Sequence, residues 1–390
     1  MKISRLLSIS AAAALMAGAF AVSSDTEAGH HEIKIGYAGG FTGYLAPYDQ
    51  PSLKGVQLAV DQLNESGGIL GMEVQLIVKD TRTDTAQSAV AAQELVDEGV
   101  VAMIVSCDVD PAVASGVVAQ AAEIPAASSC ASTPTLPAAV GPYMFSNYTA
   151  DNLQGAVLAQ YAREQGYQNA YILLSRDTPY TEKLPEYFGE AFENMGGNIV
   201  AVGEYATGQQ DFSAEVTNIK GLDPQPDVIQ TSAYEPDFPA FIKQLRAAGI
   251  DTPVLGSDGI DSPTTFGLGD VAEGVVFSNA GFASPGSPLE AYEMAYEEKY
   301  GEPNDTVFTA TGYDLMMVIA AAIEAAGSTE GPAIRDAWDN LENVEVATGL
   351  ITYKGQGRVP VRVVALNMVV DGDRVHVGDF SPDIDMIPAP

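Results

Sequence analysis

The residues that most readily suggest chemistry are the glycines of a loop near the start of the chain. Gly39, Gly40 and Gly43 follow a short apolar stretch, which is where dinucleotide-binding proteins hold a pyrophosphate on a glycine-rich turn. That motif needs the spacing G-x-G-x-x-G, a helix directly after it and an acidic residue about 20 residues further on. Here Ala38 stands at the first position, and the first acidic residue at a strand end, Asp80, comes too late. The spacing disfavours a nucleotide site and favours a flexible turn that lets backbone approach something in a cleft.

Cysteine and histidine, which often carry chemistry, are rare in this chain. Cys107 and Cys130 are the only cysteines; in an oxidising compartment such a pair predicts one disulfide, and two buried free thiols are the alternative. The three histidines are His30, His31 and His376. No Ser-His-Asp set, metal-ligand spacing or phosphate-binding P-loop accompanies them. The sequence therefore predicts a protein that is not an enzyme and that has no cofactor or metal.

The stretch 33–71 shows which elements must position any functional residues. Apolar residues alternate over 33–37, which predicts a strand. From about residue 51 they recur three and four positions apart, which predicts a helix. Gly67 and Gly68 end that helix because glycine accepts the left-handed conformation that a helix end often needs. A second strand follows, so the stretch is a strand–loop–helix–strand unit.

The same rhythm of strands and helices continues along the whole chain, with Asp110 and Asp151 predicted as helix caps. Alternation of this kind predicts parallel sheets with helices on both faces, an α/β fold. Such sheets bind ligands at the carboxyl ends of their strands. The loops of interest therefore follow Tyr37, Ser106, Ser128, Ser175, Ser232 and Leu255.

Charge and the N-terminus indicate where the protein works. The 390 residues include 52 acidic and 18 basic ones, a formal net charge of −34, which argues against binding nucleic acid or an anionic membrane surface. Lys2 and Arg5 precede an apolar run over 6–20 that is too short to span a membrane comfortably. This pattern predicts a secretory signal peptide and leader over 1–28. No cysteine lies near its end, so we expect export to the periplasm without a lipid anchor.

The N-terminal part of the sequence also resembles a known protein family. The stretch 33–71, IKIGYAGGFTGYLAPYDQPSLKGVQLAVDQLNESGGILG, resembles the opening of periplasmic substrate-binding proteins of the leucine/isoleucine/valine type, which serve ABC importers. The order of motifs is similar at intervals to about Phe380. The resemblance implies the type I periplasmic-binding-protein fold: two doubly wound parallel-sheet lobes joined by a hinge of three crossovers. Carried onto this sequence, the N-terminal lobe would comprise 29–148 and 281–352, and the C-terminal lobe 149–280 and 353–390.

The resemblance also implies a binding site for a small solute. The loop SSCASTP, 128–134, aligns with a family loop whose hydroxyl and amides hold a substrate carboxylate while a carbonyl takes the ammonium. This implies a role for Cys130, Ala131 and Ser132, and Ser106 stands where the family often completes the carboxylate grip. Asp258 matches the acidic residue that pairs with the ammonium, although an aspartate before glycine is also common in ordinary turns.

Three tyrosines and one aspartate complete the expected site. Tyr48, Tyr180 and Tyr234 match positions where the family lines its cleft with aromatic rings, which offer apolar area and one polar tip. Asp108 departs from the family pattern, because a carboxylate there would repel a ligand carboxylate. It either points away, pairs with a donor, or indicates a ligand that lacks a carboxylate.

We therefore expect an extracytoplasmic solute-binding protein of an ABC importer. Its two lobes would close on a small polar solute, an amino acid of the branched-chain type in the first place. An amide, urea or another small organic solute is the alternative ligand, and a secreted sensory module of the same fold is the alternative function. The expected partner is an ABC permease in the inner membrane, and the protein is expected to be a monomer that binds no nucleic acid.

Overall fold

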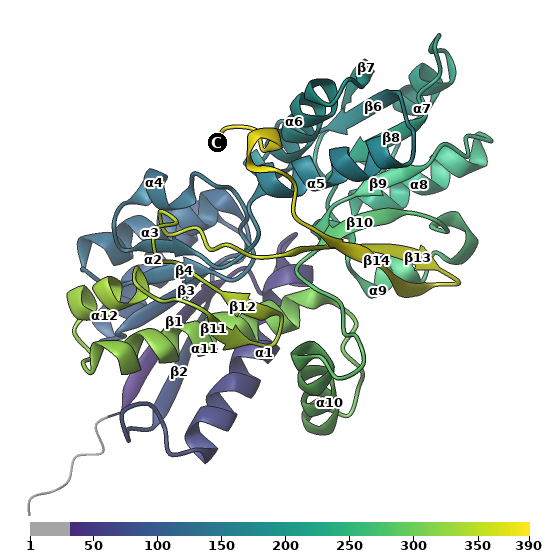
Figure 1. Cartoon of the computed structure of the whole chain (residues 1–390). Coiled ribbons are helices and arrows are strands. Elements are labelled where there is room, and N and C mark those ends of the chain that lie inside the picture. The colour runs from purple at the N-terminus through teal and green to yellow at the C-terminus, as the bar shows by residue number, and fades with distance from the viewer. Residues whose placement is uncertain (1–31) are drawn as a thin grey trace, which may run out of the picture. The chain divides into compact units, whose positions relative to one another are not determined.

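The computed structural model describes residues 32–390. The predicted signal peptide and leader, 1–28, and the histidines His30 and His31 lie outside the described residues. The described residues form one compact unit, Glu32–Pro390, which contains two large sheets (Figure 1).

The first large sheet has five strands in the order β2-β1-β3-β4-β5, and every neighbouring pair is parallel. The first strand in sequence is central to it: Ile35 lies beside Leu76 on one side and Ala102 on the other. Its strands are β1 (Ile33–Gly39), β2 (Val74–Asp80), β3 (Ala102–Val105), β4 (Ala126–Ser128) and β5 (Met144–Ser146).

Helices from both ends of the chain pack with this sheet. α1 and α11, which are far apart in sequence, lie side by side (Figure 1). They approach closely at Gly55 and Gly312: a Cβ atom at Gly55 would lie 1.7 Å from the carbonyl oxygen of Thr309. The helices of this half are α1 (Ala46–Glu65), α2 (Thr85–Asp97), α3 (Val109–Ala121), α4 (Leu136–Val140), α10 (Pro288–Tyr300), α11 (Val307–Ala326) and α12 (Gly331–Trp338).

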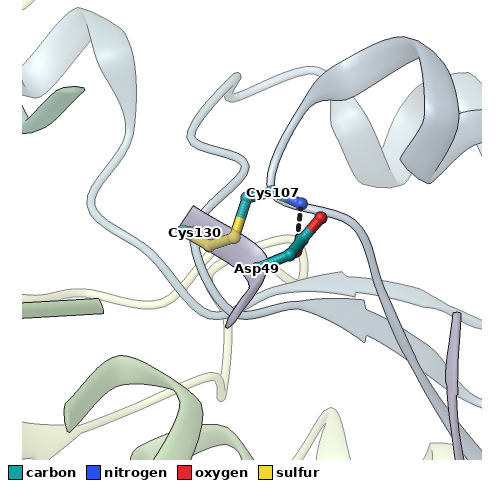
Figure 2. Close-up of side chains that lie close together, drawn as sticks. All are labelled: Asp49, Cys107 and Cys130. Carbon is teal, nitrogen blue, oxygen red and sulfur yellow. Dashed lines mark hydrogen bonds between the residues drawn. A yellow bond between two sulfur atoms is a disulfide. The ribbon is translucent and has the colours of Figure 1, made fainter. Parts of the chain in front are cut away.

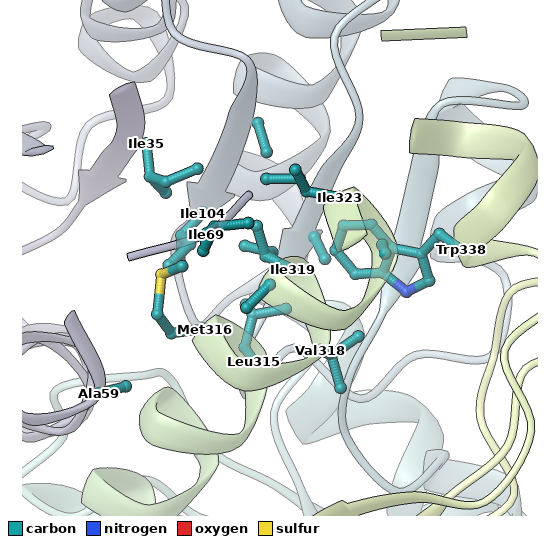
Figure 3. Close-up of a cluster of buried hydrophobic side chains, with 14 of the residues drawn as sticks. Ile35, Ala59, Ile69, Ile104, Leu315, Met316, Val318, Ile319, Ile323 and Trp338 are labelled. Atoms are coloured by element: carbon teal, nitrogen blue, oxygen red, sulfur yellow. The ribbon is translucent and has the colours of Figure 1, made fainter. Parts of the chain in front are cut away.

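The core between this sheet and α11 is aliphatic with one aromatic stack. Ile35 and Ile104 of the sheet meet Ile319 of α11, and all three are fully buried (Figure 3). Trp338 of α12 stacks on Phe145 of β5, with ring centroids 4.6 Å apart. α11 is apolar and long enough to cross a membrane, but 78% of it is buried inside the protein, so it serves here as a core helix.

The second large sheet has seven strands in the order β14-β13-β10-β9-β8-β6-β7. Its first five strands in sequence are parallel, whereas β13 joins β10, and β14 joins β13, in antiparallel pairs. The strands are β6 (Asn169–Leu174), β7 (Asn198–Glu204), β8 (Val228–Thr231), β9 (Val254–Gly256), β10 (Val276–Asn279), β13 (Val364–Val370) and β14 (Asp373–Phe380).

The remaining elements cover the second sheet or connect the two sheets. A short antiparallel hairpin of two strands precedes β13. These elements are α5 (Asp151–Glu164), α6 (Pro179–Asn194), α7 (Ser213–Lys220), α8 (Asp237–Ala247), η1 (Asp258–Ile260), α9 (Pro263–Phe266), η2 (Gly269–Val271), β11 (Val344–Val346), β12 (Gly349–Ile351) and η3 (Ile384–Met386).

A buried ion pair ties the connecting segments together. Arg362, between β12 and β13, donates to the Asp314 carboxylate of α11 at 2.9 Å and to the carbonyl oxygen of Asn147, which follows β5. Both charged side chains are almost fully buried. One guanidinium thus joins three segments that lie far apart in sequence.

The structure confirms the predicted fold class, because parallel sheets flanked by helices fill both halves. One local prediction was wrong: α3 is capped by Asp108, not Asp110. The Asp108 side chain accepts the amide hydrogen of Val109, the first residue of the helix. Likewise Ala150, not Asp151, is the cap residue of α5.

Candidate functional site

Strand-end loops of both sheets meet around one small cavity of about 20 Å³, which has room for about one water molecule. Its walls come from residues that follow β1, β3, β4, β6, β8 and β9, together with the start of α11. This is the edge at which parallel sheets bind ligands. The walls are formed by Tyr48, Cys107, Cys130, Tyr180, Tyr234, Asp258, Gly259 and Phe308.

Five of the eight predicted site residues therefore line one cavity: Tyr48, Cys130, Tyr180, Tyr234 and Asp258. A larger open groove of about 710 Å³ runs past the start of α1, but it contains none of the predicted residues. The small cavity is the better candidate because it gathers aromatic rings and a buried carboxylate from both halves of the protein.

The tyrosines form a connected aromatic wall. Tyr180 and Tyr234 stack with ring centroids 5.3 Å apart, and Tyr48 lies 5.7 Å from Tyr234. The Tyr48 hydroxyl donates to the carbonyl oxygen of Gly259 at 3.0 Å and accepts the amide hydrogen of Glu235 at 2.8 Å. Because Tyr48 belongs to α1, these bonds connect the first half of the protein to loops of the second sheet.

Asp258 is the carboxylate of this wall. It begins η1 directly after β9 and is only 3% exposed. Its Oδ1 accepts a hydrogen bond from the Tyr180 hydroxyl at 3.2 Å. Burial raises the pKa of Asp258 to about 7, and the hydrogen bond from Tyr180 offsets part of that rise. A cation placed in the cavity would restore the ionised form.

Cys107 and Cys130 are joined as a disulfide, with Cα atoms 4.8 Å apart, and Asp49 lies beside them (Figure 2). The Asp49 carboxylate accepts the amide hydrogens of Cys107 at 3.0 Å and Gly40 at 2.6 Å, and the Tyr37 hydroxyl at 3.3 Å. Burial raises the pKa of Asp49 to about 7. Asp49 thus holds the glycine-rich loop and the disulfide loop together. Disulfide sulfurs offer no thiolate for a metal ion, so this group is structural.

The loop after β4 is ordered by Ser128. Its hydroxyl donates to the carbonyl oxygen of Ser106 at 2.7 Å and accepts the amide hydrogens of Cys130 and Ala131. Ala131 packs in the core, where its carbonyl oxygen accepts the Ser146 hydroxyl. The predicted Ala131 is therefore placed beside the cavity rather than in its wall.

Ser132 and Ser106 also lie beside the cavity. The carbonyl oxygen of Ser132 accepts the amide hydrogen of Asp151 at 2.8 Å, which ties the loop to the start of α5. The Ser106 hydroxyl donates to the carbonyl oxygen of Ala38 on β1 at 3.3 Å. Ser106 thus uses its hydroxyl between two strands, and its contact with a solute stays a prediction, as does that of Ser132.

Asp108 is buried and pairs with a donor. Its second oxygen, Oδ2, accepts the Tyr44 hydroxyl at 3.0 Å while Oδ1 caps α3. Burial raises the pKa of Asp108 to about 6. Tyr44 lies against Tyr234, with ring centroids 5.9 Å apart, so Asp108 sits directly behind the aromatic wall. Of the three possibilities for this residue, pairing with a donor is what the structure shows.

Sequence reasoning missed Asp151 as a site residue, because an acidic residue at a helix start is usually a cap. It is fully buried at the start of α5, and neither carboxylate oxygen has a hydrogen-bond partner among the described residues. Burial raises its pKa well above the usual range. The Ser132 hydroxyl lies near enough to lower this pKa without meeting hydrogen-bond geometry, and the charges of Asp258 and Asp108 raise it further. The residue type alone did not indicate that this carboxylate is buried without a hydrogen-bond partner.

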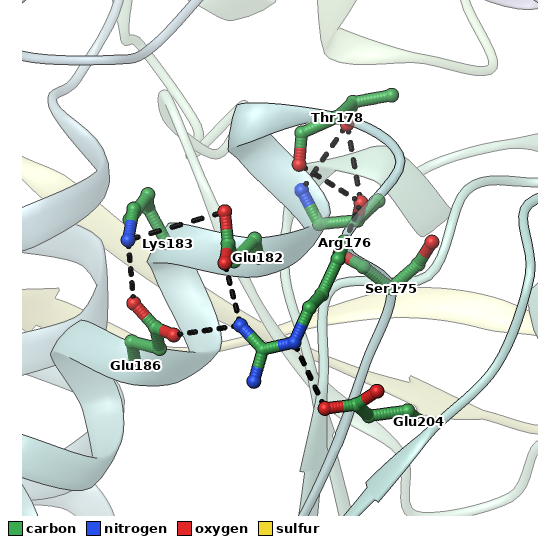
Figure 4. A network of polar contacts seen from close by, with 8 residues as sticks. Ser175, Arg176, Thr178, Glu182, Lys183, Glu186 and Glu204 are labelled. Carbon is green, nitrogen blue, oxygen red and sulfur yellow. Dashed lines mark hydrogen bonds and ion pairs between the residues drawn. The ribbon is translucent and has the colours of Figure 1, made fainter.

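Charged side chains on the surface hold the loop that precedes α6, the helix whose first turn carries Tyr180. Arg176 bridges Glu182 of α6 and Glu204 of β7, at 2.6 and 2.8 Å (Figure 4). In the same loop, the Thr178 hydroxyl caps α6 and lies 3.1 Å from the Tyr234 hydroxyl. Exposed ion pairs of this kind contribute about 0–1 kcal/mol each, so this network orients the loop more than it stabilises the fold.

Comparison with known proteins identifies the family. Residues 32–373 match the family model described as periplasmic binding protein. A Leu/Ile/Val-binding protein of Rhizobium johnstonii is 29% identical over 339 residues, which cover 84% of this chain and 89% of the relative.

Solved structures agree on the fold. The branched-chain amino acid transporter substrate-binding protein of Streptococcus pneumoniae, in complex with isoleucine, superimposes with a TM-score of 0.82 at 26% identity, covering 89% of this chain and 98% of that one. A solute-binding protein of an ABC transporter from Rhodopseudomonas palustris, in complex with 3,4-dihydroxybenzoic acid, superimposes with a TM-score of 0.80 at 22% identity, covering 90% of this chain and 97% of that one. At that identity the likeness supports the fold alone. By its sequence and its fold, the chain belongs to the periplasmic binding protein family.

Proposed function

We propose that this chain is the solute-binding component of an ABC importer and works in the periplasm. The observation that carries the proposal is the meeting of strand-end loops from both sheets around one cavity lined by tyrosines and Asp258. The Rhizobium johnstonii relative and the Streptococcus pneumoniae structure carry names that state amino-acid binding or transport. A small solute with an ammonium group fits Asp258, and amino acids are the first solutes to test.

The proposed mechanism is closure of two lobes on the solute. We place the N-terminal lobe at 29–148 and 281–352 and the C-terminal lobe at 149–280 and 353–390, so the cavity lies between them. Bonds such as that from Tyr48 to Gly259 cross between these lobes, and a bound solute would add contacts on both sides. Closure would then change the surface presented to a permease. The protein would act as a monomer and carry out no reaction of its own.

A thermal-shift panel of amino acids, amines, amides and organic acids tests the proposal. A solute present at 100 times its dissociation constant adds about 2.7 kcal/mol to the free energy of unfolding, which is easily measured. Calorimetry on any responding solute should give one site per chain. A panel without a single stabilising solute would contradict a solute-binding function, and chemical turnover of a panel member would instead indicate an enzyme.

A further inference from the structure

Three buried carboxylates surround the proposed solute site: Asp258 lies in the cavity wall, and Asp108 and Asp151 lie behind it. Asp108, Asp151 and Asp258 are 2%, 0% and 3% exposed. Asp108 follows β3, Asp151 begins α5 and Asp258 follows β9, so the three carboxylates come from separate parts of the chain. Contacts place them around the same cavity: the Asp151 amide donates to the Ser132 carbonyl oxygen of the loop that holds Cys130, and Asp108 bonds Tyr44, whose ring lies 5.9 Å from that of Tyr234 in the cavity wall. Consistent with this, the charges of Asp108 and Asp258 raise the pKa of Asp151.

No cation of the described residues pairs with any of the three. The salt bridges over 32–390 include none of these aspartates. The two arginines whose charges reach this region are already engaged: Arg362 with Asp314 at 2.9 Å, and Arg374 with Asp261 at 2.7 Å. The part of the chain that the structure describes therefore supplies no counter-charge to this cluster.

Asp151 is the member that most clearly calls for a ligand. Tyrosine hydroxyls bond Asp108 and Asp258. By contrast, both oxygens of Asp151 are buried, and within residues 32–390 neither has a partner in hydrogen-bond geometry, the Ser132 hydroxyl being the nearest polar group that affects its pKa. The N-terminal end of α5 offsets part of its charge. A buried carboxylate without partners is nevertheless costly, and most buried carboxylates are paired. A positively charged group brought by the solute would supply what is missing.

We propose that the solute is an organic cation, with an ammonium or guanidinium group and no carboxylate. This inference rests on the solute-binding function proposed above and names its ligand class. A zwitterionic amino acid would bring a carboxylate of its own into a small cavity beside Asp108, Asp151 and Asp258, and like charges repel. A cation is attracted by all three carboxylates and by the faces of the surrounding tyrosines.

The test compares solutes that differ only by the carboxylate. Suitable pairs are 3-methylbutylamine with leucine, agmatine with arginine, cadaverine with lysine, 2-phenylethylamine with phenylalanine and ethanolamine with serine. Calorimetric titration of the whole mature chain at pH 8 should show at least one amine bound tenfold or more tightly than its amino acid. In Asp108→Asn and Asp151→Asn that ratio should shrink at least threefold. Asp237→Asn changes a buried carboxyl outside the cavity wall, and it should leave the ratio unchanged.

A second measurement excludes the competing explanation, in which a protonated Asp108 donates a hydrogen bond to a ligand carboxylate. Amine affinity should rise between pH 6 and pH 8 as the carboxylates ionise, whereas amino-acid affinity held by a protonated Asp108 would fall. The facing tyrosines have raised pKa values and stay neutral in this range. These tyrosines are Tyr44, Tyr48, Tyr180 and Tyr234. Further titratable groups that face the three carboxylates are Asp49, Asp110, Asp261, Tyr148 and Tyr187, and the pKa of Asp49, raised to about 7 by burial, lies in the same pH range.

The outcomes separate this inference from the proposed function. Tighter binding of an amino acid than of its amine, or binding only of neutral or anionic solutes such as benzoate, overturns the inference and leaves the solute-binding function standing. Binding of no solute from any charge class overturns both. If Asp151→Asn does not fold, Asp108→Asn and the pH dependence of the wild type still decide the question.

Discussion

Replacing Asp258 by asparagine should weaken cation binding strongly, because it removes the one carboxylate in the wall of the cavity. The substitution keeps the shape of the side chain and its tendency to form a turn. It therefore isolates the charge of Asp258. The Tyr180 hydroxyl can still donate to the new amide oxygen, so the aromatic wall should remain in place.

The size of the expected loss in binding free energy follows from the burial of Asp258. At about 4 Å and an effective dielectric constant near 20, one carboxylate attracts one cation by about 4 kcal/mol. Truncating one partner of a buried charge pair typically costs roughly 2–5 kcal/mol, mostly through faster dissociation. Since Asp258 is only 3% exposed, we expect a loss of affinity in this range, roughly 30-fold to several thousand-fold.

The pH dependence of binding gives a second readout of the same residue. A cation binds the ionised form of Asp258, so affinity is full above its pKa of about 7 and falls as the pH falls through that value. Between pH 8 and pH 6, wild-type affinity should drop by about tenfold, since about nine-tenths of the groups become protonated. Asp258→Asn should lose this step and keep the weaker titration of the remaining buried carboxylates, of which Asp108 has a pKa of about 6 and Asp151 a pKa raised by burial.

The assay is calorimetric titration of both proteins with one amine and one neutral amide, at pH 8 and pH 6. Asp237→Asn is the matched control, because Asp237 is buried, has a pKa raised to about 6 by burial and accepts the Gly208 amide hydrogen, and its side chain does not line the cavity. Full affinity of Asp258→Asn for the amine, with an unchanged pH profile, would refute the reasoning and make Asp258 an ordinary turn residue.

Three further predictions concern the framework of the site. Alkylation without reductant should leave Cys107 and Cys130 unmodified by intact mass, and reduction should lower the free energy of unfolding by roughly 3 kcal/mol for their separation of 23 residues; two alkylated thiols before reduction would contradict this. Gly55→Ala should lower the free energy of unfolding, measured in urea, by roughly 1–3 kcal/mol or more, because the new Cβ would lie 1.7 Å from a carbonyl oxygen of α11. An unchanged urea midpoint of unfolding would show that α1 and α11 separate easily. Arg362→Ala should cost roughly 3–5 kcal/mol by leaving Asp314 buried without its partner; an effect below 1 kcal/mol would mean that water or protonation replaces the pair.

The sequence was sufficient to predict the fold class and much of the cavity wall. Strand ends are marked by apolar stretches, and parallel strands place their carboxyl ends at one edge. Cys130, Tyr180, Tyr234 and Asp258 each follow such an end, so their meeting could be predicted. The antiparallel pairs at the end of the second sheet could not be predicted in this way, because the direction of a strand depends on how the chain returns to the sheet.

Pairing and burial were less accessible from the sequence. Tyr44 and Asp108 are separated by 64 residues, and nothing in either local sequence indicates that they bond. The predicted cap of α3 was wrong by two residues, because Asp108 and Asp110 are both residue types that cap helices well. Pro111 does not decide between them, since residues in the first turn of a helix need no amide hydrogen for the helix's own hydrogen bonds. Asp151 was taken for a cap, since its missing partner becomes visible only when both halves of the protein are in place.

A crystal structure of the chain with its tightest-binding amine tests the central claim most directly. We expect density for one solute between Tyr180, Tyr234 and the Cys130–Ser132 loop, with its nitrogen within about 3 Å of an Asp258 oxygen, a charge-assisted hydrogen-bond distance. Density in the open groove beside Lys54 and Glu302 instead, with the small cavity unchanged, would contradict it.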